Sequence, residues 1–230
     1  MKKALIIGGN SGIAQALKQQ LQNHYSIEVL SRENTDYSDQ SLQLSKLRFE
    51  QSGPFQLIVN CIGVLQNQVL SPEKRIEHLS QEVLLEYFRV NTILPAMCMK
   101  YFIGLLDREN QSVYINLSAM VGSIDDNRLG GWYGYRSSKA ALNMMVKNAA
   151  IELIRRNKKA CLVAMHPGTT QTELSKPFSA KIDKDKYYTP EQSAERILSV
   201  AADLSVEDMG KFFNWDGTEI NWRITLTNKF

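Results

Sequence analysis

Short runs of apolar residues recur along the chain, and segments with apolar residues three and four positions apart separate most of them. Runs of four to six apolar, partly β-branched residues predict strands that are buried on both faces of a parallel sheet. The intervening segments predict helices with one apolar face. The predicted strands are Ala4–Ile7, Ile27–Leu30, Leu57–Asn60, Val113–Leu117, Cys161–Met165 and Lys211–Asn214, and the predicted helices are Gly12–Gln22, Gln81–Leu106, Tyr135–Arg156 and Pro190–Asp203.

Two details refine this pattern. The segment after Leu30 is too short for a helix before a further short strand expected around Thr35–Tyr37, so we expect one helix to be missing there. In the helix Tyr135–Arg156, the inward face is expected to carry Ala141, Met144, Met145, Asn148 and Leu153. Alternating strands and helices, with no repeat or Pro/Gly/Ser linker, predict an α/β fold. Residues 1–230 are expected to form a single-domain, doubly wound parallel sheet with helices on both faces.

Composition and charge narrow the classes of protein. Of 230 residues, 43% are hydrophobic, enough for a sizeable core, and 27 Lys+Arg against 24 Asp+Glu give a net charge of +3. The basic residues are scattered, so we expect no nucleic-acid partner, and the apolar runs are too short for a membrane span. Cys61, Cys98 and Cys161 lie in apolar contexts without metal-ligand spacing, which predicts buried thiols in a reducing, cytoplasmic compartment and no metal site.

A glycine-rich turn follows the first predicted strand and opens the first predicted helix. Turns of this kind bind phosphate, because the backbone lacks Cβ atoms and the helix N-terminus attracts negative charge. The spacing Gly-x3-Gly-x-Ala departs from the general dinucleotide pattern, and a glycine turn without a ligand is the alternative interpretation. The candidate phosphate-binding residues are Gly8, Asn10, Ser11, Gly12 and Ile13.

The end of the second predicted strand bears on which dinucleotide is bound. An acidic residue at this point binds the ribose 2′-hydroxyl, whereas an arginine accommodates a 2′-phosphate. Here the strand is followed by Ser31 and Arg32, which favours NADP(H) over NAD(H). Glu33 weakens this inference, and a solvated surface charge is the alternative role for Arg32.

Tyr135 and Lys139 are four residues apart on a predicted helix, so their side chains share a face. A neighbouring ammonium lowers the pKa of a phenol and makes proton transfer to or from an alcohol feasible. Tyr133 has Ser137 at the equivalent position and lacks such a partner. An ordinary surface Tyr–Lys pair is the alternative.

Further polar residues are expected at the same place in the fold. Ser118 and Asn60 stand at the ends of two predicted strands, and the carboxyl ends of parallel strands share one edge of the sheet. Gly63 follows Asn60 closely, and Asn91 is a polar residue on an otherwise apolar helix face. Together with the glycine turn, these residues predict a ligand crevice at that edge.

This ordered set resembles the classical short-chain dehydrogenases/reductases, over about Lys3 to Trp222. The resemblance implies a Rossmann fold, a catalytic tetrad of Asn91, Ser118, Tyr135 and Lys139, and an adenine contact at Asp36. It also implies cofactor contacts from Asn60, Gly63, Tyr135 and Lys139, and a segment on the nicotinamide side made of Pro167, Gly168, Thr170 and Thr172. The stretches His166–Thr170, Leu174–Phe178 and Phe213–Gly217 look like the C-factor-like subgroup.

The resemblance implies that the chain is an NAD(P)-dependent oxidoreductase that transfers hydride between nicotinamide and a small-molecule carbonyl or secondary alcohol. Tyr135 would act as the general acid/base, and a homodimer or homotetramer is expected. Ser118 and Tyr135 are 17 residues apart, more than is usual in the family, so the loop 122–131 is expected to border the substrate pocket. Two rivals stay open: a catalytically weak signalling or regulatory protein of the C-factor type, and a sugar-nucleotide epimerase or dehydratase.

Overall fold

The computed structural model describes residues 1–176 and 187–221. In these residues a six-stranded parallel sheet forms the centre of the molecule, in the strand order β2-β1-β3-β4-β5-β8, and β6 and β7 form a separate pair. The strands are β1 (Lys2–Ile7), β2 (Tyr25–Leu30), β3 (Leu57–Asn60), β4 (Ser112–Leu117), β5 (Ala160–Met165), β6 (Thr169–Thr170), β7 (Tyr187–Tyr188) and β8 (Phe212–Phe213).

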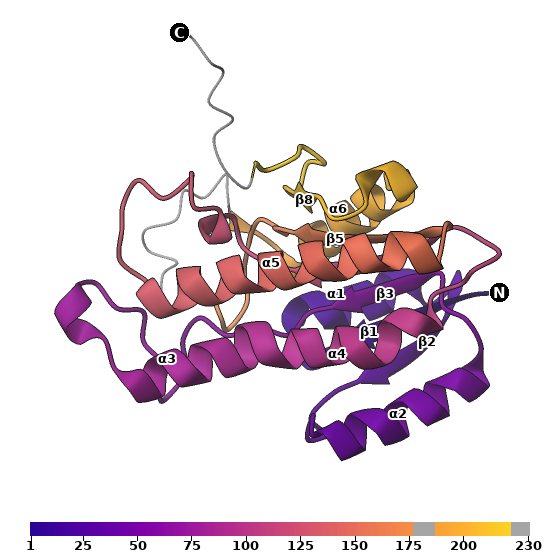
Figure 1. Cartoon of the computed structure of the whole chain (residues 1–230), viewed down its shortest axis with the longest axis horizontal. Helices are drawn as coiled ribbons and strands as arrows, with labels where there is room; N and C mark the ends of the chain where they lie inside the picture. The colour runs from indigo at the N-terminus through magenta and orange to yellow at the C-terminus, as the bar shows by residue number, and fades with distance from the viewer. Residues whose placement is uncertain (177–186, 222–230) are drawn as a thin grey trace, which may run out of the picture.

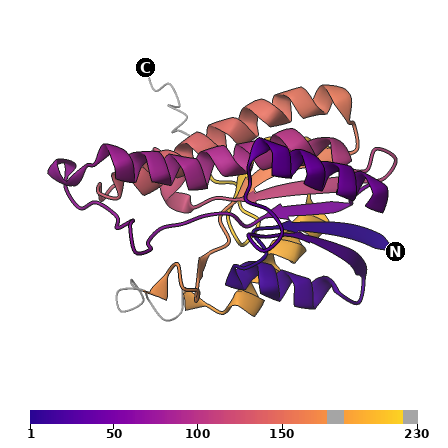
Figure 2. The same ribbon diagram turned by 90° about the horizontal axis from the view of Figure 1, so that it is seen from below.

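Helices cover both faces of this sheet, as Figure 2 shows. One face packs against α1 (Gly12–Leu21) and α6 (Pro190–Asp203), and the other packs against α2 (Asp39–Ser52), α4 (Leu94–Phe102) and α5 (Tyr133–Arg156). The helix α3 (Gln81–Phe88) precedes α4 and lies beside α5 (Figure 1). Short turns complete the chain: η1 (Ile76–His78), the π-turn η2 (Arg89–Ile93), η3 (Ile103–Leu105), η4 (Met120–Gly122) and η7 (Val206–Asp208).

The core follows from the alternation of side chains along the strands. In β1, Leu5 and Ile7 join the apolar cluster on one face, while Ala4 and Ile6 join the cluster on the other. All four are fully buried, as the continuous apolar run predicts for a strand covered on both sides. The predicted doubly wound α/β fold is confirmed. The chain turns from β1 to β2 in one direction and to β3 in the other, so the ligand crevice is expected at the carboxyl ends of β1 and β3.

The prediction for the segment after Leu30 was wrong. Residues 35–37 form no strand, because Ser31–Asn34 fold into a turn and Tyr37 adopts a left-handed conformation with φ 61°. A full helix, α2, then follows. Its inner face carries Leu42, Ser45 and Phe49, and this mixture of apolar and polar residues gave too weak a hydrophobic period to predict a helix.

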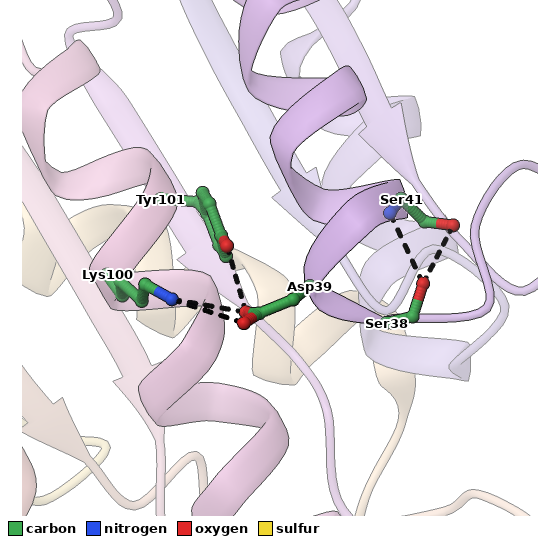
Figure 3. A network of polar contacts seen from close by, with 5 residues as sticks. All are labelled: Ser38, Asp39, Ser41, Lys100 and Tyr101. Carbon is green, nitrogen blue, oxygen red and sulfur yellow. Dashed lines mark hydrogen bonds and ion pairs between the residues drawn. The ribbon is translucent and has the colours of Figure 1, made fainter.

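Polar contacts at the start of α2 attach it to α4 (Figure 3). The hydroxyl oxygen of Ser38 accepts a hydrogen bond from the Ser41 amide at 3.2 Å, which caps the helix. Asp39 Oδ1 accepts hydrogen bonds from Tyr101 at 2.8 Å and from Lys100 at 3.1 Å. These contacts fix the position of the helix that the sequence did not predict.

The predicted helix Gln81–Leu106 is interrupted by the π-turn η2. Pro95 has no N–H to donate to the carbonyl of Asn91, so the regular ladder of hydrogen bonds cannot continue through this turn. The π-turn stands directly before that proline and contains Asn91. Such turns occur frequently at functional sites.

The inward face of α5 agrees with the predicted one at Leu153, which is buried, but differs from it elsewhere. Met144 and Met145 are 61% and 44% exposed, whereas Leu142, Val146 and Ala150 are buried. The helix begins at Tyr133, and its buried residues face β4, β5 and α3. The apolar residues of this long helix are scattered around its axis, so the sequence pattern alone does not determine which side faces the core. Across residues 1–176 and 187–221, none of the helices combines the length and apolar character that crossing a membrane requires.

Candidate active site

The glycine turn after β1 forms a cradle of backbone at the N-terminus of α1. Gly8 has φ 79°, and its amide donates to the carbonyl of Leu30 at 2.8 Å. Ser11 caps the helix by accepting a hydrogen bond from the Ala14 amide at 3.1 Å. A Cβ atom on Gly12 would lie 3.1 Å from Cγ2 of Thr172, so the turn and the segment after β5 lie against each other. The first turn of α1 contains no acidic residue, and this cradle fits a phosphate-bearing cofactor.

The turn after β2 presents Arg32 to solvent. Ser31 is buried, and its hydroxyl accepts a hydrogen bond from the Glu33 amide at 3.3 Å. The Glu33 carboxylate accepts a hydrogen bond from Asn10 at 3.4 Å, while Arg32 forms no ion pair within the described part of the chain. Glu33 therefore bridges back to the glycine turn, and the neighbouring guanidinium stays available.

Asp36 is an exposed residue between β2 and α2. Hydrogen bonds from Ser41 and Ser38 lower the pKa of its carboxyl group to about 2, so it is ionised at neutral pH. The carboxylate accepts a hydrogen bond from the Ser38 amide at 2.9 Å, which holds it just before the first residue of α2.

Asn60 and Gly63 follow β3 at the carboxyl edge of the sheet. The Asn60 side chain accepts a hydrogen bond from the Ile62 amide at 3.1 Å and donates to Asn116 on the neighbouring strand at 3.2 Å. A Cβ atom on Gly63 would lie 3.1 Å from Nζ of Lys139. A bare backbone at this position is therefore required for the lysine to approach.

Asn91 connects three segments from the π-turn. Its side-chain oxygen accepts a hydrogen bond from the Val64 amide at 2.8 Å, and its amide group donates to the Val64 carbonyl at 2.9 Å and to the Ser138 hydroxyl at 3.1 Å. Thr92 donates to the Ser138 carbonyl at 2.7 Å. Ser138 immediately precedes Lys139, so these bonds fix the position of α5, at the residue before Lys139, relative to the segment that follows β3.

Lys139 and Ser118 meet at the end of β4. The Lys139 ammonium donates to the carbonyl of Leu117 at 3.0 Å, and Ser118 donates to Oδ1 of Asn143 at 2.6 Å. Lys139 is only 3% exposed, and burial lowers the pKa of its amino group to about 8. The amino group therefore stays mostly protonated at pH 7 and loses its charge as the pH rises through about 8.

Tyr135 is buried between two aromatic rings. The centroids of Tyr87 and Trp132 lie 6.3 and 6.2 Å from that of Tyr135, both in edge-on geometry. Burial raises the pKa of the Tyr135 phenol above its ordinary value. This direction is opposite to the one expected from the Tyr–Lys spacing, because the shift is caused by desolvation of the buried phenol. The phenol therefore keeps its proton at neutral pH.

The segment after β5 folds over the start of α6. Gly168 has φ 81°, and Pro167 is buried. The hydroxyls of Thr170 and Ser193 share a hydrogen bond of 2.7 Å, and Thr172 contacts the glycine turn as described above. Pro177 and Phe178 lie outside the described residues. Both belong to the stretch Leu174–Phe178, which resembles the C-factor-like subgroup.

The structure thus brings the sequence-predicted tetrad, the glycine turn and the segment after β5 to one edge of the sheet. Sequence reasoning missed Asn143, Tyr87 and Glu73, which contact this group. Asn143 lies four residues after Lys139, and this spacing on one helix face was the available signal. Glu73 and Tyr87 carry no such signal, since their partners are far away in the chain.

Comparison with known proteins agrees with this arrangement. The family model described as short chain dehydrogenase matches residues 3–183. The chain is 27% identical to 1-hydroxy-2-glutathionyl-2-methyl-3-butene dehydrogenase of Rhodococcus sp. (strain AD45), over 96% of this chain and 100% of that protein. It is 36% identical to C-signal of Myxococcus xanthus, over 59% of this chain and 76% of that protein.

A solved structure shares the fold along nearly the whole chain. The NADPH-bound carbonyl reductase from chicken fatty liver superimposes with a TM-score of 0.81 at 21% identity, covering 96% of this chain and 99% of that one. The match to the family model covers well over half of the sequence, and the expected resemblance is confirmed. The chain therefore belongs to the short-chain dehydrogenase/reductase family and is an NAD(P)-dependent oxidoreductase.

Proposed function

We propose that the protein reduces a small-molecule carbonyl compound with NADPH, using Tyr135 as the proton donor. The observation that carries this proposal is the convergence of a phosphate cradle, a buried phenol and a buried lysine at one sheet edge. We also propose that residues 1–230 act as one domain. A protonated phenol suits reduction, since the carbonyl oxygen gains a proton as it becomes an alcohol.

The cofactor, when bound, supplies the hydride. Tyr135 donates its proton to the carbonyl oxygen, and its raised pKa keeps that proton in place until the oxygen becomes basic. Ser118 stabilises the charge that develops on the same oxygen by turning its hydroxyl away from Asn143, its partner in this structure. Trp132 and Tyr87 exclude water from the phenol.

Lys139 and Asn91 serve the proton supply and the positioning of α5. Burial lowers the pKa of Lys139 to about 8, so the amine can release and regain a proton near neutral pH. Asn91 holds Ser138, and with it the backbone that carries Lys139. The residues proposed to hold the cofactor are Gly8, Asn10, Ser11, Gly12, Ile13, Ser31, Arg32, Asp36, Asn60, Gly63, Tyr135, Lys139, Pro167, Gly168, Thr170 and Thr172.

NADP(H) is proposed in preference to NAD(H). Arg32 is an exposed cation without an acidic partner in the described residues, and it follows β2 where a 2′-phosphate is recognised. The NADPH bound by the chicken fatty liver enzyme supports this choice.

Assembly and location stay predictions. We propose a homodimer or homotetramer that buries the apolar face of α5 and the adjoining turn, where Ile93, Met144, Met145 and Ile151 are exposed. The similarity to C-signal keeps a signalling or regulatory protein as the second candidate function. We expect a cytoplasmic protein, in agreement with three cysteines that are free thiols.

The experiment follows NADPH oxidation at 340 nm with a panel of ketones, aldehydes and quinones, alongside NADPH and NADH titrations. Turnover of at least one carbonyl class with tighter binding of NADPH is expected. Tight NADPH binding without any turnover would favour the signalling candidate, and tighter NADH binding would contradict the role given to Arg32.

A further inference from the structure

The helix that carries Tyr135 begins from an unusual turn. Gly130, Gly131 and Trp132 have φ values of 64°, 66° and 53°, so three successive residues adopt the left-handed conformation. This conformation is costly for a residue with a Cβ atom such as tryptophan. Trp132 is the N-cap of α5 but forms no capping bond through its side chain, and the first turn contains no acidic residue. The start of the helix must therefore be held by another part of the chain.

Glu73 supplies this support from the loop before α3. Its backbone carbonyl accepts a hydrogen bond from the Trp132 amide at 2.5 Å, and its Oε2 accepts one from the Gly134 amide at 3.1 Å. A Cβ atom on Gly131 would lie 3.3 Å from the same carbonyl oxygen. One residue thus fixes the strained turn through its backbone and caps the helix through its side chain.

The burial of Glu73 shows that its carboxylate belongs to this contact. The residue is 4% exposed, whereas the adjoining Lys74 and Arg75 are exposed. A buried carboxylate is costly unless it is compensated, and the N-terminus of a helix provides a partial positive charge. A Cβ atom on Gly134 would lie 2.9 Å from Oε1, so the helix can approach the carboxylate only because residue 134 is glycine. Oε1 has no hydrogen-bond partner among the described residues.

The same group reaches Tyr135 through aromatic packing. A Cβ atom on Gly134 would lie 2.4 Å from Cδ2 of Tyr87, so Tyr87 and Glu73 meet at the first turn of α5. Burial, and next the charge of Glu73, raise the pKa of Tyr87, which keeps its hydroxyl protonated to donate to the Leu65 carbonyl at 2.6 Å. Trp132, whose amide is bound by Glu73, and Tyr87, which lies beside Glu73 at this turn, are the rings that enclose the Tyr135 phenol.

We propose that Glu73 is a positioning residue for the reaction, which sets the start of α5 and the aromatic enclosure so that the Tyr135 phenol points at the substrate carbonyl. The proposal rests on the proposed function in that Tyr135 is taken as the proton donor. It assigns to Glu73 no contact with substrate or cofactor.

Steady-state kinetics of two variants test the proposal. Glu73→Gln keeps a side-chain oxygen that can accept the Gly134 amide, whereas Glu73→Ala removes it. Because small displacements of reacting groups cost much of the rate, Glu73→Ala is expected to lower kcat at least about tenfold, with KM for NADPH within about twofold. Glu73→Gln is expected to restore most of kcat. Wild-type kcat in Glu73→Ala, or an equal loss in Glu73→Gln, would overturn the proposal.

A second measurement separates this proposal from the proposed function. Hydrogen exchange of peptides spanning residues 130–140 is expected to accelerate in Glu73→Ala and to stay near wild type in Glu73→Gln. Ser205→Ala, which removes the cap of the remote turn η7, is the control for loss of a cap elsewhere and should leave both kcat and this exchange unchanged. If the wild type reduces no carbonyl, the proposed function fails while the exchange pattern still decides the role of Glu73.

Should Glu73→Ala fail to fold, kcat and hydrogen exchange are measured on Glu73→Asp instead. Its carboxylate is one methylene shorter and is drawn back from the Gly134 amide. A smaller loss of kcat with faster exchange in residues 130–140 is expected. Exchange in Glu73→Asp identical to that of the wild type, together with unchanged kcat, would overturn the proposal.

Discussion

The amino group of Lys139 lies 3.1 Å from the position that a Cβ atom on Gly63 would occupy. The lysine comes from α5 and the glycine follows β3, so this contact joins the two halves of the candidate active site. The side-chain oxygen of Asn91 lies 3.5 Å from the same position. Any side chain at residue 63 must therefore displace the lysine, the asparagine or the backbone itself.

Substitution of Gly63 is expected to weaken NADPH binding without preventing the chain from folding. In Gly63→Ala the new methyl group crowds the Lys139 amino group, which must shift by a few tenths of an ångström and strains its bond to the Leu117 carbonyl. We predict that NADPH affinity falls about tenfold or more, from lost positioning of the lysine. Isothermal titration checks this, with Gly104→Ala as control, since a Cβ atom there would have no atom within 4 Å. Equal affinities in both variants would contradict the prediction.

Lys139 is expected to make stability depend on pH. Its pKa is lowered by burial from the ordinary 10.5 to about 8, so between these values the unfolded chain binds more protons than the folded one. The free energy of unfolding therefore rises with pH between about 8 and 10.5. Below about pH 8 the buried ammonium lowers that free energy by up to about 3 kcal/mol.

The measurement is denaturant unfolding of the wild type and Lys139→Met from pH 7 to 10.5. Lys139→Met is predicted to be the more stable protein at pH 7, and the difference is predicted to shrink as pH rises. Lys158→Met, which changes an exposed lysine at the end of the loop after α5, should give a constant difference. A pH-independent difference for Lys139→Met would mean that the lysine has an ordinary pKa.

Much of this site could be predicted from the sequence, and the failures have physical causes. Ser118 and Asn60 could be placed because they end strands whose apolar runs are unmistakable, and parallel strands share a carboxyl edge. The helix α2 was missed because Ser45 interrupts its apolar face. Glu73 could not be found, because it resembles the solvated charges beside it and its partners lie about 60 residues further along the chain.

The prediction that the Tyr135 pKa is lowered was wrong for a related reason. Spacing on a helix shows that two side chains share a face, but it does not show how deeply that face is buried. Tyr135 and Lys139 are both almost completely enclosed, and desolvation then favours the neutral form of each.

Ser118 is expected to affect the chemical step more than cofactor binding. In Ser118→Ala the hydroxyl that meets the developing negative charge is lost, and we predict that kcat falls about 10²-fold. The Kd for NADPH should change little, because Ser118 is not among the residues proposed to hold the cofactor. Ser123→Ala is the matched control, since Ser123 is buried in the neighbouring loop and donates to a backbone carbonyl. An equal loss in both variants would point to loop packing instead.

Arg32 is expected to decide the choice of dinucleotide. A charge-assisted bond between a guanidinium and a phosphate contributes about 1.5–3 kcal/mol, so Arg32→Ala should weaken NADPH binding about 10- to 100-fold. NADH binding should be unchanged, because NADH has no 2′-phosphate. Titrations of both nucleotides check this, with Arg48→Ala on the exposed side of α2 as control. A parallel loss of NADH affinity would show that Arg32 acts through the fold.

Two tyrosines of the first turn of α5 distinguish a proton donor from a neighbouring phenol most clearly. Tyr135→Phe removes the buried hydroxyl, while Tyr133→Phe removes one from a half-buried neighbour two residues earlier. With a carbonyl substrate that the wild type turns over, Tyr135→Phe is predicted to lose NADPH oxidation by at least about 10²-fold while still binding NADPH, and Tyr133→Phe to stay near wild type. Full activity in Tyr135→Phe would contradict the assignment of this residue as the proton donor.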